Sequence, residues 1–311
     1  MENNKPSFSE LFESTVNYPD PDLKDRLDLL VGLDDTKEKI KKLLSILINP
    51  DGVKEWVDKH HKGAEQILNF VNRRPPLIIL AGDVGSGKSE LAYTIGDAVA
   101  RQEKLNVELF PLSLATRGQG RVGQMTQLVS AAFEYTLEKA KKLKSETGKS
   151  RGAVILMIDE ADALAQSRES DQMHHEDKAG VNAFIRGIDS LGNGKFPAAV
   201  IMCTNRPDSL DPAIKRRAAE IIYFKRPDEG ARYAVLSDAL KELDFSENEV
   251  QDLVSLTGPR NGIDYGFTFS DIVQRLIPAI VIDAYPDKAV DAQRAMMIAE
   301  KIIPTSPFKE S

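Results

Sequence analysis

Five short apolar runs are spaced along the chain, and the segments between them carry apolar residues at helical spacing. Runs of this kind predict strands that are buried on both faces, and the helical segments predict crossover connections. The predicted strands are residues 77–81, 105–110, 154–158, 199–203 and 220–224. The alternation predicts an α/β fold, in which a parallel sheet is covered by helices on both faces.

The pattern changes near residue 228 and is purely helical from there to the C-terminus. Four helices are predicted near 230–242, 246–256, 269–284 and 287–303, and Pro278 should kink or split the third of them because proline lacks a backbone donor. We therefore expect a large α/β domain over 27–228 and a small all-helical lid domain over 229–311.

The first 26 residues carry three prolines and many acidic side chains. This composition predicts an N-terminal arm over 1–26 that has little fold of its own. Phe8, Leu11 and Phe12 could anchor the arm to a neighbour, and plain disorder is the alternative.

Composition narrows the class of protein. A chain of 311 residues suits one large and one smaller domain. The net charge of −7 disfavours broad binding to nucleic acid, so we expect no nucleic-acid partner. The lone cysteine, Cys203, fits a reducing compartment, the polar N-terminus is unlike a secretory signal, and no apolar run approaches the roughly 18 residues of a membrane span. We expect a cytoplasmic protein without a membrane partner.

The segment 82–89 completes the pattern G-x-x-x-x-G-K-[ST], directly after a predicted buried strand and at the start of a predicted helix. Backbone N–H groups of such a loop surround phosphate oxygens, Lys88 reaches the β- and γ-phosphates, and the Ser89 hydroxyl binds Mg²⁺. The predicted phosphate-binding residues are Asp83, Val84, Gly85, Ser86, Gly87, Lys88 and Ser89. The segment predicts binding of ATP with Mg²⁺.

Two further strands end in polar residues that suit phosphate chemistry. The run 154–158 leads into Asp159, which can bind Mg²⁺, and Glu160, which can act as a base toward a water molecule. An apolar strand that ends in acids is a weak signal alone and a strong one beside a phosphate loop. The strand over 199–203 is followed by Asn205, which can hold the attacking water, although an ordinary turn residue would look the same.

Arg216 and Arg217 follow a short predicted helical turn that begins at Leu210-Asp211-Pro212-Ala213. A guanidinium group pairs with phosphate oxygens and stabilises charge in a transition state. The two arginines could reach the ATP of a neighbouring subunit and act in trans, or they could form a solvated basic corner.

These four features, in this order and followed by a helical lid, resemble an AAA+ ATPase over about residues 30–303. The resemblance implies a ring, usually a hexamer, with ATP and Mg²⁺ bound. It implies that Val31 and Gly32 lie beside the adenine, that Asn205 is the first sensor, and that Arg216 and Arg217 are arginine fingers.

Two segments resemble the protein-remodelling clade of that superfamily: the run 210–217 and the lid sequence Gly-Phe-Thr-Phe-Ser-Asp-Ile over 266–272. This register places Ser270 where other groups carry a sensor-2 arginine. Arg260 and Arg275 are candidate substitutes, and neither is assigned. The segment 181–189 is similar to the pachytene-checkpoint group, which remodels HORMA-domain proteins, in its short bacterial form that accompanies anti-phage signalling systems.

The predicted pore loop, 117–123, departs from the clade's pattern because Arg121 takes the place of an aromatic residue. Arginine stacks and pairs with acids but grips an extended chain less well than an aromatic ring. Either this ring grips acidic or polar peptide, or Arg117 and Arg121 are ordinary loop residues.

Three functions remain open on the sequence. We favour an ATP-hydrolysing hexameric remodeller that acts on a partner protein, with a HORMA-domain protein as the candidate substrate. The alternatives are a nucleic-acid-directed ATPase of the clamp-loader or initiator type, and an ATP-gated scaffold that does not turn over. The acidic charge weighs against the first alternative, and Glu160 weighs against the second.

Overall fold

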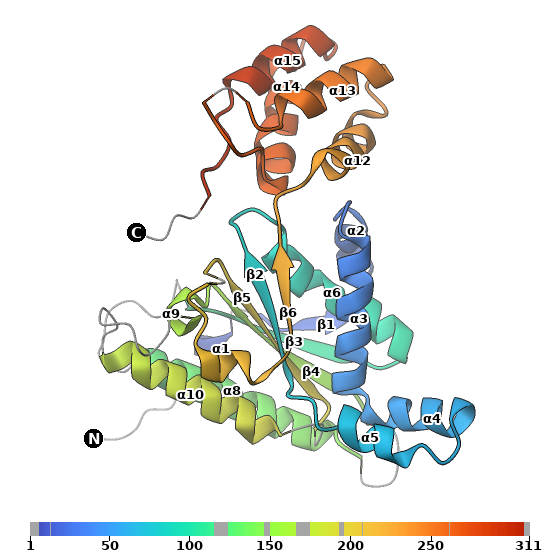
Figure 1. Ribbon diagram of the computed structural model, residues 1–311, viewed down its shortest axis with the longest axis vertical. Helices are drawn as coiled ribbons and strands as arrows, with labels where there is room; N and C mark the ends of the chain where they lie inside the picture. Colours follow the sequence, from blue (N-terminus) through green and yellow to red (C-terminus); the bar gives the residue numbers. More distant parts are fainter. Residues whose placement is uncertain are drawn as a thin grey trace. The chain divides into compact units, whose positions relative to one another are not determined.

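A six-stranded sheet forms the centre of the N-terminal two thirds of the chain (Figure 1). The computed structural model describes residues 6–12, 14–114, 124–145, 150–165, 175–192, 196–206, 208–260 and 262–307. The predicted pore loop with Arg117 and Arg121 lies outside these ranges. Two units are distinguished. The sheet unit comprises Met1–Leu27, Asp35–Ala81 and Ser89–Tyr223, and the helical unit comprises Asp28–Asp34, Gly82–Lys88 and Phe224–Ser311.

The strand order is β1-β3-β4-β5-β2-β6, and the three central pairings β3–β4, β4–β5 and β5–β2 are parallel. The strands are β1 (Val16–Tyr18), β2 (Leu77–Gly82), β3 (Val107–Ser113), β4 (Ala153–Asp159), β5 (Ala198–Thr204) and β6 (Ala218–Phe224). The predicted α/β sheet is confirmed, and all five predicted strands are present with ends shifted by at most three residues. The sixth strand, β1, was not predicted and pairs antiparallel with β3.

Both faces of the central strands are buried. On β5, Val200 packs with Phe133 and Phe184 of the helices that cover one face. Its neighbour Ile201 points to the opposite face and is also fully buried. Figure 1 shows α8 and α10 on one side of the sheet and α3 and α6 on the other. Burial on both faces explains why these strands are continuous apolar runs instead of alternating ones.

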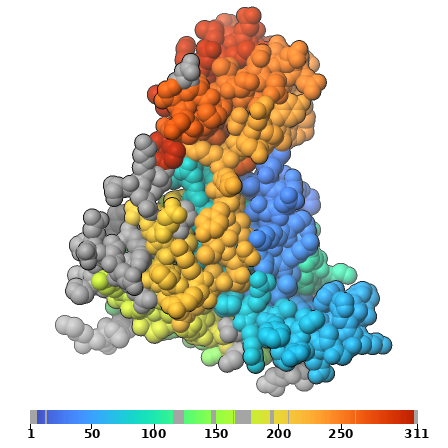
Figure 2. All heavy atoms as spheres, in the orientation of Figure 1, coloured from blue at the N-terminus to red at the C-terminus, as the bar shows by residue number. Residues whose placement is uncertain are grey.

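The helices of the sheet unit connect the strands and flank the sheet. They are α3 (Asp34–Ile48), α4 (Pro50–His60), α5 (Glu65–Val71), α6 (Lys88–Glu103), α8 (Gln124–Leu143), α9 (Asp162–Ala165), α10 (His175–Leu191) and α11 (Pro212–Lys215). The edge strand β6 lies at the surface of the face seen in Figure 2, and its Tyr223 is exposed.

The N-terminal segment differs from the extended arm that its composition predicts. It forms α1 (Phe8–Leu11), the edge strand β1 and α2 (Pro21–Asp28). Leu11 and Phe12 are buried, and the ring centroids of Phe12 and Phe110 lie 5.1 Å apart. The segment adds to the fold because aromatic burial and strand pairing offset its polar composition.

The helices of the helical unit are α12 (Glu229–Leu240), α13 (Glu247–Leu256), α14 (Ile277–Ala284) and α15 (Ala292–Lys301). They enclose a separate core that includes Leu236, Leu253, Phe267 and Ile280. Pro278 was expected to kink or split the third helix, but the helix continues through this position. A π-helical segment, η1 (Asp271–Leu276), leads directly into α14, and Pro278 lies in the first turn of α14.

No helix in the described ranges is both long enough and apolar enough to cross a bilayer.

Candidate nucleotide-binding and hydrolysis site

The phosphate loop depends on glycine backbone geometry. Gly82, Gly85 and Gly87 have φ of 148°, 72° and 91°, a region that L side chains rarely adopt. At Gly82 a Cβ atom would lie 2.2 Å from the carbonyl oxygen of Phe224, so a side chain has no room there. The chain can therefore follow the close curve that exposes successive N–H groups to an anion. The residues present fit the phosphates of a nucleotide.

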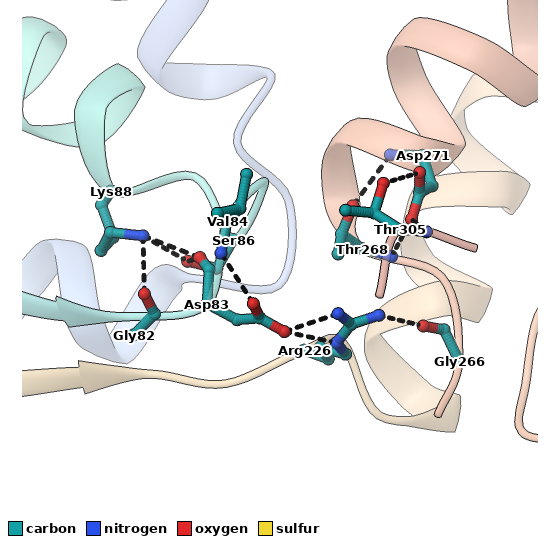
Figure 3. A network of polar contacts seen from close by, with 10 residues as sticks. All are labelled: Gly82, Asp83, Val84, Ser86, Lys88, Arg226, Gly266, Thr268, Asp271 and Thr305. Carbon is teal, nitrogen blue, oxygen red and sulfur yellow. Dashed lines mark hydrogen bonds and ion pairs between the residues drawn. The ribbon is translucent and has the colours of Figure 1, made fainter. Parts of the chain in front are cut away.

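Lys88 lies within this loop and is 6% exposed. Its Nζ donates to the carbonyl oxygens of Gly82 at 3.0 Å and Asp83 at 2.7 Å (Figure 3). Ser86 is buried, and its hydroxyl donates to the same Asp83 carbonyl at 2.7 Å. The loop thus holds the ammonium group that the sequence assigns to the β- and γ-phosphates.

Val31 and Gly32, which the resemblance places beside the adenine, belong to the same unit as the phosphate loop. Val31 packs against the core of the helical unit. Gly32 has φ of 78°, and a Cβ there would lie 3.2 Å from the Cβ of Ala231 at the start of α12. Both residues therefore lie where the chain enters the helical unit, and their role toward adenine stays a prediction.

Ser89 and Asp159, the two residues predicted to bind Mg²⁺, are brought together in the sheet unit. Ser89 lies in the first turn of α6 and donates its hydroxyl to Asp159 Oδ1 at 3.0 Å. Asp159 is the last residue of β4. A hydroxyl and a carboxylate are the hard oxygen ligands that Mg²⁺ prefers, so the donor set fits this ion.

Glu160 directly follows β4 in a strained conformation. Its φ of 52° is uncommon for a residue with a side chain and tends to occur at functional sites. Its N–H donates to Asp159 Oδ1 at 2.9 Å, and its exposed carboxylate accepts from Ser113 Oγ at 2.9 Å. The turn directs the side chain to the carboxyl edge of the sheet, where ligands of open α/β sheets bind.

Asn205, the predicted water-orienting residue, follows β5 and is held by one carboxylate. Asp162 Oδ1 accepts from the Asn205 N–H at 2.7 Å and from Thr204 Oγ1 at 2.9 Å. Asp162 Oδ2 accepts from Asn205 Nδ2 at 3.2 Å. The amide group therefore has a defined orientation, in which its side-chain oxygen is turned away from Asp162.

The two predicted arginine fingers differ in their surroundings. Arg217 makes a two-pronged ion pair with Asp189 at 2.8 and 2.9 Å, which raises the pKa of the guanidinium above its ordinary value. Arg216 is exposed, and its Nε donates to the Pro212 carbonyl at 3.3 Å. Both arginines line a surface hollow of about 530 Å³ that also includes Pro75 and Ile188.

Side chains that contact predicted site residues but were missed by the sequence interpretation include Asp189, which pairs with Arg217, and also Ser113, Asp162 and Arg226. Asp162 had a signal, because it follows Glu160 by two residues in an acid-rich run. Ser113 ends β3, and its role follows from the parallel register that pairs it with Asp159. Arg226 is 143 residues from its partner Asp83, and no local pattern connects the two.

Comparison with known proteins agrees with this geometry. Residues 78–226 match the family described as "ATPase family associated with various cellular activities (AAA)". The chain is 60% identical over 306 residues to "CD-NTase-associated protein 6" of Escherichia coli (strain MS 115-1), covering 98% of both chains. It is 35% identical to a protein of the same name from Escherichia coli (strain KTE188), covering 97% of this chain and 98% of that relative.

Two solved structures are also similar over nearly the whole chain. One, "Structure of E. coli MS115-1 HORMA:CdnC:Trip13 complex", contains a chain that is 58% identical, with a TM-score of 0.89 over 98% of this chain and all of that chain. The other, "Structure of Rhizobiales Trip13", is 53% identical, with a TM-score of 0.74 over 96% of this chain and all of that one.

Proposed function

Because this chain belongs to the AAA family of ATPases, and within it to the family of CD-NTase-associated protein 6, we propose that it remodels a HORMA-domain protein in bacterial anti-phage signalling. The chain is an ATPase, and in this proposal ATP hydrolysis changes the conformation of the bound partner. The supporting observation for the partner is that a solved structure with a 58% identical chain is described as a complex with HORMA and CdnC.

ATP is bound in this proposal by the loop 82–89, with its N–H groups and Lys88 on the phosphates. Val31 and Gly32 contact the adenine. Ser89 and Asp159 would hold Mg²⁺, which neutralises charge on the β- and γ-phosphates when it is bound. The 3.0 Å contact between Ser89 Oγ and Asp159 Oδ1 is the observation that carries this part of the proposal.

Hydrolysis requires a base and an oriented water molecule. Glu160 accepts a proton from the attacking water, and Asn205, held by Asp162, orients that water. Arg216 and Arg217 of an adjacent protomer stabilise negative charge in the transition state, as supplied arginines do in related phosphoryl transfer. The proposal therefore includes a homo-hexamer in which each site is completed by its neighbour.

The finer organisation follows the same proposal. Residues 27–228 form the large ATPase domain, residues 229–311 form the lid, and residues 1–26 precede both. The proposal also assigns the protein to the cytoplasm, and the single cysteine supports this because a reducing compartment disfavours disulfides.

Replacement of Glu160 tests the proposal. Glu160→Gln removes the base but keeps the size and polarity of the side chain, so we expect the ATPase rate to fall by about 10²–10⁴-fold while ATP binding is retained. The variant should then remain bound to its partner in the presence of ATP. Turnover is measured by phosphate release, and partner capture by co-purification with a purified bacterial HORMA-domain protein.

The matched control is Glu55→Gln, which changes an exposed carboxylate of α4 and should leave both measurements unchanged. Wild-type turnover in Glu160→Gln would remove Glu160 from its role. Capture of DNA in place of protein, with ATPase stimulated by DNA, would instead support the nucleic-acid alternative.

A further inference from the structure

One side chain of the phosphate loop carries the same sign of charge as the proposed ligand. Asp83 adjoins the loop's lysine, since its carbonyl oxygen lies 2.7 Å from Lys88 Nζ. Its carboxylate is largely buried, and Oδ1 accepts from the Val84 N–H at 2.9 Å. A buried anion at this position repels a triphosphate unless a cation balances it.

Arg226 supplies the balancing charge and extends the contact. Its Nε and Nη2 lie 2.7 and 2.6 Å from Asp83 Oδ2, and the two side chains are only 15% and 16% exposed. Its Nη1 donates to the Gly266 carbonyl at 2.7 Å (Figure 3), and the guanidinium lies 5.0 Å from the ring centroid of Tyr265. One guanidinium group thus connects the phosphate loop to residues 265–266.

A second contact joins the phosphate loop to the turn that follows Tyr265, residues Gly266–Asp271. The Ser270 N–H of this turn donates to the Gly85 carbonyl at 3.1 Å. A Cβ on Gly85 would lie 2.7 Å from Thr268 Oγ1, so the tip of the loop packs against the turn without room for a side chain. The phosphate loop and residues 266–270 are therefore joined by hydrogen bonds and are also closely packed.

The turn itself is fixed by Asp271. Its carboxylate accepts from the N–H groups of Thr268 and Thr305, both at 3.0 Å (Figure 3). One carboxylate, at the start of η1, thus binds both Thr268 of the turn and Thr305 of the C-terminal segment.

Two other arginines of the helical unit have different partners. Arg260 donates to the carbonyl oxygens of Ala299 at 3.2 Å and Glu300 at 3.1 Å, and Arg275 pairs with Asp271 at 2.6 Å. Of these three arginines, Arg226 is the one that contacts the phosphate loop.

We propose that Asp83 and Arg226 form a positioning pair that makes the Gly266–Asp271 turn respond to ATP in the phosphate loop. The inference rests on the proposed function, since it requires the loop to bind ATP. The triphosphate and Asp83 both attract Arg226, so nucleotide binding weakens the hold of Asp83 on the guanidinium and displaces the Gly266 carbonyl that Arg226 binds. Arg226 is a positioning residue because it acts through Asp83 and Gly266.

A double-mutant cycle tests the pair, with two readouts for each variant: the Kd of a fluorescent, slowly hydrolysed ATP analogue, and amide hydrogen exchange over 266–271 with and without it. Arg226→Ala leaves the Asp83 carboxylate unbalanced, so we expect the Kd to rise on the order of tenfold. Asp83→Asn added to Arg226→Ala should restore the Kd to within about threefold of wild type. The exchange response to nucleotide over 266–271 should be lost in both variants.

The conservative variant Arg226→Lys keeps the charge but not the two-pronged geometry, so it should hold the Kd near wild type and weaken the exchange response. Arg294→Ala is the matched control, because it removes a guanidinium that pairs with Asp283 at the surface of the same unit. It should leave both readouts unchanged.

Two results would overturn the inference: a wild-type Kd and exchange response in Arg226→Ala, or no recovery of the Kd in the double variant. If Arg226→Ala does not fold, the same two measurements on the single variant Asp83→Asn test the inference. It should bind the analogue severalfold more tightly and lose the exchange response, and unchanged behaviour overturns the pair. Failure of the wild-type protein to bind the analogue would instead contradict the proposed function.

Discussion

At the scale of single residues, the side chains that act on the attacking water in the proposed mechanism are held by others that do not. Ser113 donates to Glu160, and Asp162 accepts three hydrogen bonds from Thr204 and Asn205. Such partners fix the orientation of a reacting group, and oriented groups contribute to rate without adding affinity.

Asp162→Asn tests this orientation. An asparagine has one acceptor oxygen where the carboxylate has two, so its amide N–H₂ must face a donor and the Asn205 side chain loses its fixed position. We expect the kcat of ATP hydrolysis to fall about tenfold with little change in KM, since the lost interaction acts mainly in the transition state. Steady-state kinetics measure both constants.

The control for this change is Asp58→Asn on the exposed face of α4, which should leave kcat and KM at wild-type values. A fall in ATP affinity with unchanged kcat in Asp162→Asn would show that Asp162 supports binding instead of orientation. A lowered melting temperature alone, with normal kinetics, would reduce Asp162 to a structural residue.

At the scale of elements, the turn before η1 depends on one buried charge. Burial acts to raise the pKa of Asp271, but hydrogen bonds from Thr268, Thr305 and Arg275 outweigh it and hold the pKa below its ordinary value. A carboxyl group whose folded pKa is lowered stabilises the fold above its unfolded pKa, and that stability is lost as the pH falls through the folded pKa.

Asp271→Asn should therefore remove part of the protein's acid sensitivity. At pH 7 the variant is expected to be less stable by about 2 kcal/mol, because an amide N–H₂ would face the donors that the carboxylate accepts. As the pH falls below about 4, the ordinary range of an aspartate, the gap to wild type should narrow. Denaturant unfolding of the helical unit, followed at several pH values, measures this difference.

Asp283→Asn serves as the comparison, because the Asp283 carboxyl also has a lowered pKa, from its hydrogen bond with Arg294, but lies at the surface. Its effect at pH 7 should be clearly smaller than that of Asp271→Asn, since solvent screens exposed pairs. Equal effects of the two changes, or a gap that widens on acidification, would contradict the role given to Asp271.

The elements also show what sequence patterns reach and where they stop. The strands β2, β4 and β5 were predictable because burial on both faces requires unbroken apolar runs. The phosphate loop and the acids after β4 were predictable because each is a local pattern. The N-terminal segment was not, since β1 is three residues long and pairs with residues about 90 positions away, such as Leu109 of β3. The ion pair between Arg226 and Asp83 could not be predicted either, because 143 residues separate the two in the sequence.

At the scale of the whole molecule, the proposal requires that each active site be shared between two protomers. Arg217 is held by Asp189 of its own chain, whereas Arg216 is exposed beside the same surface hollow. If Arg216 acts on the ATP of a neighbour, Arg216→Ala and Glu160→Gln damage the two halves of one site. Each variant alone should then be inactive, with rates reduced on the order of 10³-fold for the arginine change.

Mixing the two inactive variants should restore activity. The Arg216→Ala protomer keeps Glu160, and the Glu160→Gln protomer keeps Arg216. A site is therefore complete when the Arg216→Ala protomer binds the ATP and the Glu160→Gln protomer is the neighbour that supplies the arginine. In an equimolar mixture that reassembles at random, half of the protomers supply Glu160 and half of their neighbours supply Arg216, so about one quarter of the interfaces are complete. Phosphate release should recover to about that fraction of wild type if the sites act independently.

The mixing experiment separates shared sites from sites within one chain. If Arg216 acted on the ATP of its own protomer, no mixture could place both groups in one site, and activity would stay at the level of the single variants. Light scattering with the slowly hydrolysed analogue must show that both variants assemble. A chain that carries both changes is the control. Mixed with either single variant it should give no recovery, because no interface then has both Glu160 and Arg216. Recovery that requires assembly and is absent from this control identifies the neighbour as the source of the arginine.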